Sequence, residues 1–431
     1  MFAEISELVR LLRNRHLPAD ELRDLQERKL RAVVRSAYER VPYYRTLFDT
    51  AGLSPADIRT LEDLKHVPIT TKEGHKAAGL ENTLARGTDP RACAPSRTAG
   101  TTGLVTVSYS SPGEARTRRL LGFRGLRAVG YGPRDRLCVI GSAALPSVRL
   151  HHRVGLFRAW HAPAGLPASE HVALLRRAQP DLLKAWPSVL RALSHAVDGR
   201  LRDLVRPRAV LTSSEVCDER LRSWIRDDLH AAHFDTYVAS EIGEIAWECQ
   251  AHEGLHVNAD HVLLECLNDK GERCQAGEPG TAVVTSLYGV VMPFIRYRVG
   301  DLCATIGRAC SCGCTFPLIA APVGRVHAVM VLPSGARRAA NGVTLHLNRI
   351  DSIHQLRFIQ EAVDHFRLLL VPTREFNQET LAFIRSRVLE AIGEPVRLDV
   401  QVVASIPEER GKFRWFISKL EGDDGRNGPA R

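Results

Sequence analysis

The 431-residue sequence lacks the features that mark membrane, secreted and nucleic-acid-binding proteins. No apolar run approaches the ~18–20 residues of a membrane span, and residues 1–18 have the apolar spacing of an amphipathic helix, not of a signal peptide. Basic residues outnumber acidic ones by 59 to 49, but no zinc-finger, RNA-recognition or basic-zipper signature concentrates them, and no internal repeat is present. We therefore expect a soluble cytoplasmic protein, bound to neither membrane nor nucleic acid, with a solvated basic surface or an attraction for anionic small molecules.

The chain is too long for one typical core, so two or three domains are expected. Residues 1–75 are predicted to be helical, with residues 20–48 as one long amphipathic stretch and Thr71 as the N-cap of a later helix. From about residue 96 to 325, short apolar runs alternate with helical stretches, which predicts an α/β domain with a largely parallel sheet. The predicted strands are 136–141, 208–214, 261–267 and 281–287, and the helical stretches include 169–186 and 188–197.

The pattern changes after about residue 326 to shorter segments, with a helix predicted over 378–393. We expect a large N-terminal domain over 1–325 and a small, mobile α+β lid domain over 326–422. Residues 423–431 are polar and rich in glycine, which predicts a disordered tail.

A loop rich in small hydroxylated residues, SRTAGTTGLVTVSYS, occupies residues 96–110. It can be a hairpin in which Gly100 and Gly103 supply positive φ. It can equally be a nest of backbone amides and hydroxyls that binds the phosphates of a nucleotide. The loop by itself does not decide between the two.

Four later segments present further chemistry-bearing residues. DTYVASEIGEIAWEC (235–249) places Ser240 and Glu241 after an aromatic strand end, and MPFIRYRVGDL (292–302) holds Asp301 in a Gly-Asp turn. VGRVHAVMVLPSG (323–335) contains Arg325 at the change of domain, and IPEERGKFRWFISKL (406–420) presents Lys412 after a glycine. Each alone is also typical of ordinary structure: a helix-start carboxylate, a turn residue, a solvated lysine.

In this order, the segments resemble the adenylate-forming (ANL) superfamily, specifically the phenylacetate–CoA ligase group and the CapK-like proteins grouped with it. The resemblance covers nearly the whole chain and implies a large adenylation domain with a small C-terminal lid. It implies Glu241 as the Mg²⁺ ligand and Lys412 as the cation that the lid brings against the carboxylate under attack. For ATP it implies Thr98, Gly100, Thr101, Thr102 and Gly103 at the phosphates, Ser213, Ser214, Glu215 and Tyr237 at the adenine with Ser240 beside them, and Asp301 and Arg325 at the ribose.

Physical chemistry agrees with these residue types. A carboxylate and ATP are both anionic, so their reaction needs Mg²⁺ and a lysine to offset repulsion at the α-phosphate. The sequence also departs from the family: Leu104 and Val105 stand where its phosphate loop commonly continues with Lys and Pro, and Ala328 stands near the usual acidic hinge residue. These departures affect the expected rate and second step more than the ATP site.

Cysteine and histidine are concentrated in CQAHEGLH (249–256) and CSCGC (310–314), dense enough for a tetrahedral Cys₃His zinc site, but the spacing is not that of a standard zinc finger and does not decide the matter. Some members of the resembled group bind zinc in these segments. The chosen ligands are Cys249, His256, Cys310 and Cys312, with His252 as the alternate and Cys314 left out; the alternative is a set of reduced core thiols. The other six cysteines are expected to be mostly reduced, small core residues: Cys93, Cys138, Cys217, Cys266, Cys274 and Cys303.

The resemblance implies an acyl pocket beside residues 136–141, the segment that follows, and Tyr237. Small residues from Gly141 onward leave room for an aryl or heteroaryl acid, and His151, His152 and Arg153 follow. We expect an AMP-forming acid–thiol ligase that uses ATP, Mg²⁺, structural Zn²⁺ and a small-molecule carboxylic acid, with CoA as the acceptor and a homodimer left open. Alternatives are an amine, carrier-protein thiol or hydroxyl acceptor, and a catalytically weak nucleotide-binding protein.

Overall fold

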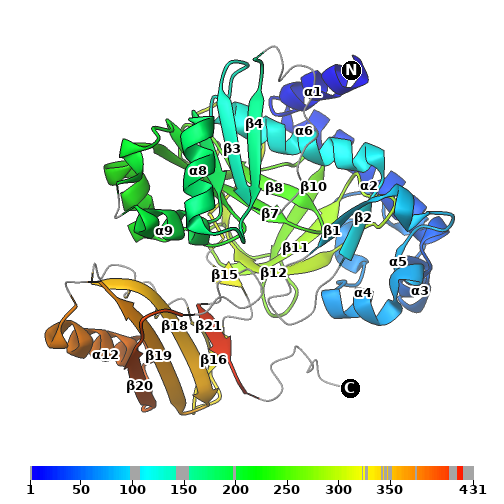
Figure 1. Ribbon diagram of the computed structural model, residues 1–431. Coiled ribbons are helices and arrows are strands. Elements are labelled where there is room, and N and C mark those ends of the chain that lie inside the picture. The colour runs from blue at the N-terminus through cyan, green and yellow to red at the C-terminus, as the bar shows by residue number, and fades with distance from the viewer. Residues whose placement is uncertain are drawn as a thin grey trace.

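The computed structural model describes residues 2–97, 107–141, 155–197, 200–322, 324–325, 329–340, 343, 347, 352–373, 376–406 and 415–420. Figure 1 shows a large α/β unit, followed along the chain by a smaller unit that contains α12 (Gln378–Ile392). This agrees with the predicted fold class. Among the described residues, no helix is long and apolar enough to cross a membrane.

The N-terminal region is helical, as predicted, but the expected continuous helix over 20–48 is wrong. Pro42 takes the first position of a new helix, and Val41 before it has an extended backbone (φ −112°, ψ 110°) because a residue that precedes proline is disfavoured in the helical region. Thr71 caps α4 by accepting a hydrogen bond from the Gly74 amide, as expected. The helices of this region are α1 (Phe2–Asn14), α2 (Ala19–Arg40), α3 (Pro42–Thr50), α4 (Lys72–Ala78) and α5 (Leu80–Thr83).

A nine-stranded sheet forms the centre of the large unit, in the order β13-β14-β9-β8-β7-β6-β5-β3-β4. Its parallel half contains β3 (Arg136–Gly141), β4 (Arg158–Pro163), β5 (Leu182–Ala185), β6 (Ala209–Ser213) and β7 (Ala232–Ala239). Its antiparallel half contains β8 (Gly243–Glu248), β9 (Leu255–Val257), β13 (Thr305–Ile306) and β14 (Leu318–Ile319). The sheet is therefore mixed, because the short turn from β7 to β8 permits only an antiparallel pair.

Helices cover both faces of this sheet, and α8 (Ala168–Ala178) and α9 (Pro187–Ala196) pack on one another. The helix predicted over 169–186 is wrong beyond residue 178. Gln179 has a left-handed backbone (φ 42°) that ends α8, and Pro180 follows it. Residues 182–185 then form β5 inside the sheet. Two further α-helices among the described residues of this unit are α6 (Pro112–Ala128) and α10 (Glu219–Ser223).

A second, antiparallel sheet has the order β10-β11-β12-β15. Two of the predicted strands lie here, so they do not extend the parallel sheet. A disulfide joins Cys266 to Cys303, which corrects the expectation that both are reduced. Of the other dispersed cysteines, Cys138 and Cys217 are buried as expected. The strands are β10 (Val262–Leu267), β11 (Gly280–Ser286), β12 (Tyr297–Cys303) and β15 (Gly324–Arg325).

Cys93 and Cys274 are only partly buried, contrary to the expectation of core positions. Cys93 directly precedes β1 (Ala94–Arg97), which pairs with β2 (Val107–Ser110) as an antiparallel hairpin. The hydroxyl-rich loop joins these two strands, and its residues 98–106 lie outside the described part of the chain.

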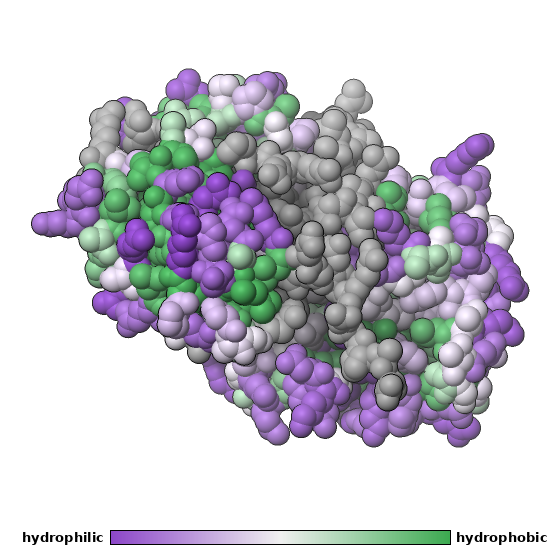
Figure 2. Space-filling view, turned by 90° about the horizontal axis from the view of Figure 1, so that it is seen from below, coloured by the Kyte–Doolittle hydropathy of each residue, from purple (hydrophilic) through white to green (hydrophobic). Residues whose placement is uncertain are grey.

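The small unit has its own core and a four-stranded sheet in the order β20-β19-β18-β21. Phe358 and Phe366 stack at its centre, under the buried face of α12, and this helix confirms the prediction for 378–393. Figure 2 shows hydrophobic residues among polar ones over this unit. The domain boundaries stay predictions, and residues 423–431 lie outside the description. The strands are β16 (Val329–Val331), β17 (Arg337–Ala339), β18 (Ile353–Ala362), β19 (His365–Pro372), β20 (Arg397–Val402) and β21 (Phe416–Ser418).

Candidate nucleotide site and metal centre

The parallel strands β3, β5, β6 and β7 end at one edge of the central sheet, where open α/β sheets bind ligands. Ser213 is the buried last residue of β6, and Ser214 after it has φ 70°. The Glu215 carboxylate accepts hydrogen bonds from the Ser188 amide (2.8 Å) and hydroxyl (3.0 Å) at the start of α9. Its anionic group thus lies at a helix N-terminus, where the backbone favours negative charge.

The turn between β7 and β8 carries Ser240 and Glu241. Arg118 of α6 donates to the carbonyl oxygen of Ser240 (3.1 Å) and to that of Glu241. The Ser108 hydroxyl, on β2, lies 3.4 Å from the Ser240 carbonyl. One end of the hydroxyl-rich loop is therefore anchored against the acidic turn that the sequence singled out.

Two hydrogen bonds cross between this turn and the second sheet. The Tyr237 hydroxyl, from β7, donates to Asp301 Oδ2 on β12 (2.9 Å). In the opposite direction, the Tyr297 hydroxyl, from β12, donates to Glu241 Oε1 (3.0 Å). Arg325 is the register partner of Asp301 in the β12–β15 ladder. The structure thus brings Tyr237, Glu241, Asp301 and the backbone of Arg325 to one place.

Sequence reasoning missed three residues that shape this place: Arg118, Tyr297 and His75. Burial, aided by nearby Glu241, raises the pKa of Tyr297, so its phenol remains a donor. His75 of α4 stacks on Phe294 and meets the Tyr297 ring edge-on, and burial lowers its pKa to about 4. Tyr297 stands within the quoted segment MPFIRYRVGDL, so its position was visible, but its partner depends on the fold.

Several predicted residues lie outside the described part of the chain. This group includes the residues of the hydroxyl-rich loop, the lysine of the small domain, the residue near the usual hinge position and the segment expected to line the acyl pocket. Their roles stay predictions. They are Thr98, Gly100, Thr101, Thr102, Gly103, Leu104, Val105, His151, His152, Arg153, Ala328 and Lys412.

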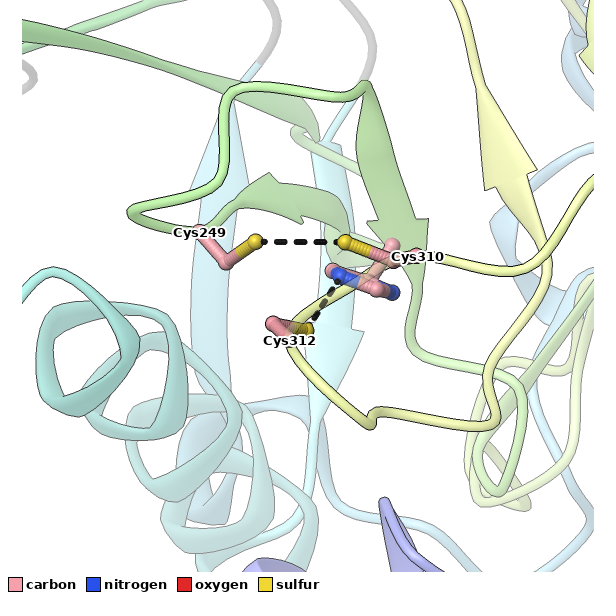
Figure 3. Close-up of side chains that lie close together, drawn as sticks. Cys249, Cys310 and Cys312 are labelled. Carbon is pink, nitrogen blue, oxygen red and sulfur yellow. Dashed lines mark hydrogen bonds between the residues drawn. The ribbon is translucent and has the colours of Figure 1, made fainter.

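The cysteine and histidine cluster is brought together as predicted. One ligand atom from each of Cys249, His256, Cys310 and Cys312 lies within 4.8 Å of the others, and the first three residues are buried. The sulfurs of Cys249 and Cys310 are 3.6 Å apart, and Cys312 Sγ lies 3.4 Å from His256 Nε2 (Figure 3). In a tetrahedral zinc site with metal–sulfur bonds of about 2.3 Å, two sulfurs lie about 3.8 Å apart. The cluster therefore has the dimensions of such a site.

The surroundings of the cluster also fit a structural metal. His256 Nδ1 lies 3.4 Å from the Phe316 carbonyl oxygen, a contact of the kind that orients a metal-binding imidazole. Without a metal ion, burial raises the pKa of the Cys249 thiol to about 12, as is typical of a buried thiol. The alternate ligand His252 instead contacts Glu248 Oε1 (3.0 Å) and is exposed. Cys314 is buried beside the cluster and its amide donates to Cys312 Sγ (3.4 Å), but its sulfur is not one of the four grouped ligand atoms. Glu241 precedes β8 and Cys249 follows it, so the length of this strand, roughly 17 Å at the usual rise, separates the acidic turn from the cluster.

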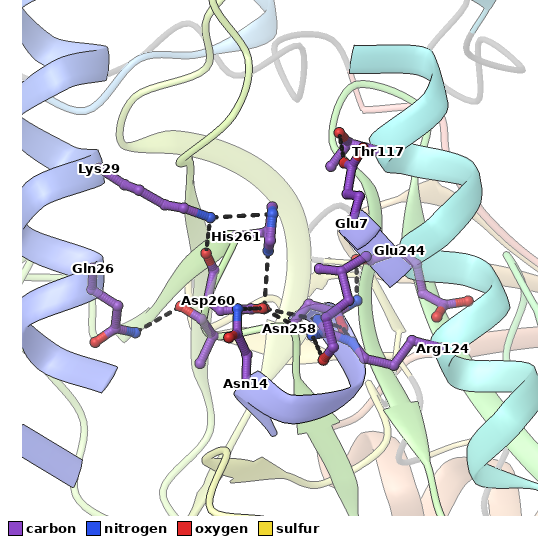
Figure 4. A network of polar contacts seen from close by, with 12 residues as sticks. Glu7, Asn14, Gln26, Lys29, Thr117, Arg124, Glu244, Asn258, Asp260 and His261 are labelled. Carbon is purple, nitrogen blue, oxygen red and sulfur yellow. Dashed lines mark hydrogen bonds and ion pairs between the residues drawn. The ribbon is translucent and has the colours of Figure 1, made fainter. Parts of the chain in front are cut away.

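A buried polar network holds the N-terminal helices to the large unit (Figure 4). Arg124 of α6 forms a two-pronged ion pair with Asp260 (2.8 and 3.0 Å), and both side chains are 0% exposed. Asn14 of α1 donates to the same carboxylate, and Lys29 of α2 donates to the Asp260 carbonyl. Burial alone would raise the pKa of Asp260, but Arg124 and His261 hold that pKa well below its usual range.

Comparison with known proteins gives the relationships of the chain. A family model described as the CapK C-terminal domain matches residues 334–419. The phenylacetate–coenzyme A ligase of Thermus thermophilus is 30% identical over 380 residues, which cover 82% of this chain and 79% of that protein. The Escherichia coli phenylacetate–coenzyme A ligase is 30% identical over 293 residues, covering 66% of this chain and 67% of that protein.

Solved structures give the same fold. A 2-hydroxyisobutyryl-CoA ligase in its postadenylation state, in complex with R3-HIB-AMP, matches with a TM-score of 0.81 at 20% identity, over 95% of this chain and 92% of that chain. The same enzyme in its thioesterification state matches with a TM-score of 0.64 at 21% identity, over the same shares. From its curated relatives and its fold, the chain belongs to the phenylacetate–CoA ligase family of adenylate-forming enzymes.

Proposed function

We propose that this chain is an AMP-forming acid–CoA ligase, which activates a carboxylic acid as its acyl-adenylate and then passes the acyl group to the thiol of CoA. The observation that carries the proposal is the pair of carboxylates, Glu241 and Asp301, held by Tyr297 and Tyr237 at the ligand-binding edge of the sheet. This arrangement occurs in a chain whose curated relatives are named CoA ligases.

In the first half-reaction, an oxygen of the acid attacks the α-phosphorus of ATP, the bond to the bridging oxygen breaks, and pyrophosphate leaves. We assign Glu241 to the Mg²⁺ ion that offsets the charge of the phosphates, and Asp301 with Arg325 to the ribose. Tyr237, Ser213, Ser214 and Glu215 are assigned to the adenine side, with Ser240 beside them. Little side-chain acid–base chemistry is needed, because position and charge lower the barrier.

The hydroxyl-rich loop is assigned to the phosphates through Thr98, Gly100, Thr101, Thr102 and Gly103. The anchoring of β2 against the Ser240 carbonyl supports this assignment, because it directs one end of the loop toward the acidic turn. Lys412, on the small domain, is assigned to the carboxylate under attack. The domain boundary at residues 325–326, which that movement requires, is part of the proposal.

In the second half-reaction, the CoA sulfur attacks the acyl carbonyl carbon, AMP leaves, and the proton of the thiol is lost to solvent. For the acid we propose an aryl or heteroaryl carboxylate. Trp186 supports this choice, because its indole approaches the carboxyl end of β3: a Cβ at Gly141 would lie 3.3 Å from the indole nitrogen. An aromatic side chain at this edge offers a flat surface to a planar substrate.

We assign structural Zn²⁺ to Cys249, His256, Cys310 and Cys312. The buried thiols, the near-tetrahedral spacings and the Phe316 carbonyl behind His256 support it. Bound there, the ion would join the loop after β8 to residues 310–312. With four protein ligands it has no open position for water, so its role is to stabilise the fold.

The acceptor is tested by mass spectrometry of reactions that contain ATP, Mg²⁺, CoA and one acid from a panel of aryl, heteroaryl and short 2-hydroxy acids. The expected result is an acyl-CoA thioester from an aryl or heteroaryl acid. Adenylate formation without thioester would instead favour an amine, a carrier-protein thiol or a hydroxyl as the acceptor. Inductively coupled plasma analysis of the purified protein tests the metal assignment, with one zinc per chain expected.

A further inference from the structure

Two tyrosine–carboxylate hydrogen bonds link β12 to the β7–β8 region, and each side supplies one phenol and one carboxylate. Each phenol donates to a carboxylate of the other strand pair: Tyr237 of β7 donates to Asp301 of β12, and Tyr297 of β12 donates to Glu241 of the β7–β8 turn. The two bonds fix the relative position of the proposed cation ligand and the proposed ribose ligand, which stand 60 residues apart in the sequence.

The partner of Glu241 is a neutral donor. Arg118 also contacts this turn, and it donates to the backbone carbonyls of Ser240 and Glu241. Within the described residues, the Glu241 carboxylate accepts a hydrogen bond from the Tyr297 hydroxyl. A phenol orients a carboxylate without cancelling its charge, so the negative charge remains for a divalent cation.

Tyr297 is itself firmly held. It is 2% exposed, its ring meets Phe294 edge-on at 4.9 Å, and it meets His75 at 5.6 Å. Its register is fixed by the bridge between Thr70 and Tyr297 beside α4. The hydroxyl therefore projects from a packed ring whose position does not depend on Glu241.

We propose that Tyr297 is a positioning residue: its hydroxyl holds Glu241 in the orientation that binds the divalent cation of the metal–nucleotide complex. The inference rests on the proposed function, because it takes Glu241 as the cation ligand. Tyr297 touches neither the nucleotide nor the acid in this role. It acts through Glu241, and removal of its hydroxyl weakens cation binding while the binding of metal-free nucleotide stays the same.

The test measures the affinity of the protein for Mn²⁺, from the electron paramagnetic resonance signal of the free ion. The nucleotide is α,β-methylene-ATP, an analogue that does not allow turnover. Tyr297→Phe keeps the ring and removes the donor. Tyr44→Phe is the matched control, because it also removes a buried phenol hydroxyl from the aromatic layer formed by Tyr43, Tyr44, His75, Phe294 and Tyr297. That hydroxyl contacts the Pro293 carbonyl (3.0 Å) and the Ile295 amide (2.9 Å), not Glu241. Glu241→Gln removes the proposed ligand charge. Binding of the analogue in EDTA, together with melting temperature, is measured for each variant.

We expect Tyr297→Phe to weaken Mn²⁺ binding about tenfold, the lower end of the range for residues behind a metal ligand. Tyr44→Phe should leave Mn²⁺ binding within twofold of the unchanged protein, and analogue binding in EDTA should hold in all variants. The double variant of Tyr297 and Glu241 should bind Mn²⁺ no more weakly than Glu241→Gln alone, even if Tyr297→Phe also lowers the melting temperature.

Two results would overturn the inference, and they differ in what else they remove. Loss of Mn²⁺ binding in Glu241→Gln but not in Tyr297→Phe would leave the assigned role of Glu241 intact and make Tyr297 a packing residue only. Unchanged Mn²⁺ binding in Glu241→Gln would instead remove Glu241 from the cation site, and with it the magnesium assignment of the proposed function.

Discussion

Replacement of His75 by phenylalanine should make the protein more resistant to acid. His75 is 4% exposed, stacked on Phe294 and packed against Tyr43 and Tyr44, and burial lowers its pKa from 6.5 to about 4. Below pH 6.5 this histidine is therefore protonated in the unfolded chain but stays neutral in the native state. The free energy of unfolding consequently falls as the pH falls toward 4. Well above pH 7 both states are neutral at this position, and the effect vanishes.

The magnitude follows from the two pKa values. Between pH 7 and pH 5, preferential protonation of the unfolded state costs the native state about 2 kcal/mol at this one residue. Urea unfolding at pH 7, 6 and 5, followed by tryptophan fluorescence, measures the free energy of unfolding. Over that interval, the value for His75→Phe should fall by about 2 kcal/mol less than that of the unchanged protein.

The control is His66→Gln, which replaces an exposed histidine of the same region and shows whether loss of any histidine gives the same effect. If His75→Phe loses as much stability between pH 7 and pH 5 as the unchanged protein does, His75 is charged in the native state. The burial argument for this aromatic layer would then be refuted.

Three further changes test other parts of the structure. Arg124→Met leaves the Asp260 carboxylate buried without its cation and should lower the free energy of unfolding, measured with urea, by about 3–5 kcal/mol. Adding Asp260→Asn to this variant should restore part of the lost stability. If the stability losses of the two single variants simply add in the double variant, the ion pair does not have this role. Cys310→Ser should lower the zinc content of the purified protein well below one per chain, whereas Cys314→Ser should keep it; equal zinc content in both would remove Cys310 from the site. Lys412→Ala should abolish adenylate formation but keep ATP binding, and unchanged turnover would remove Lys412 from the mechanism.

The sequence predicted the elements of the fold better than their arrangement. Apolar runs marked β3, β6, β10 and β11, and helical periodicity marked α12, because those signals are local. The direction of β10 and β11 was predicted wrongly, since an apolar strand has the same composition in a parallel and an antiparallel sheet. Likewise, the sequence of residues 182–185 has the pattern of a helix. In the structure these residues form β5, because they are buried between two neighbouring strands.

The candidate sites divide in the same way. Cys249, His256, Cys310 and Cys312 were chosen from their spacing and the family resemblance, and the fold places these four together. The contact of Tyr297 with Glu241 joins positions 56 residues apart and has no local signal. The same is true of the Cys266–Cys303 disulfide, which depends on β10 and β12 lying on either side of β11.

Acyl-adenylate formation is tested by the acid-dependent exchange of labelled pyrophosphate into ATP, measured over a panel of aryl, heteroaryl and short 2-hydroxy acids without CoA. Because adenylation is reversible, we expect Mg²⁺-dependent exchange with at least one aryl or heteroaryl acid and none without acid. If the protein binds ATP but supports no exchange with any acid of the panel, it does not form the proposed acyl-adenylate.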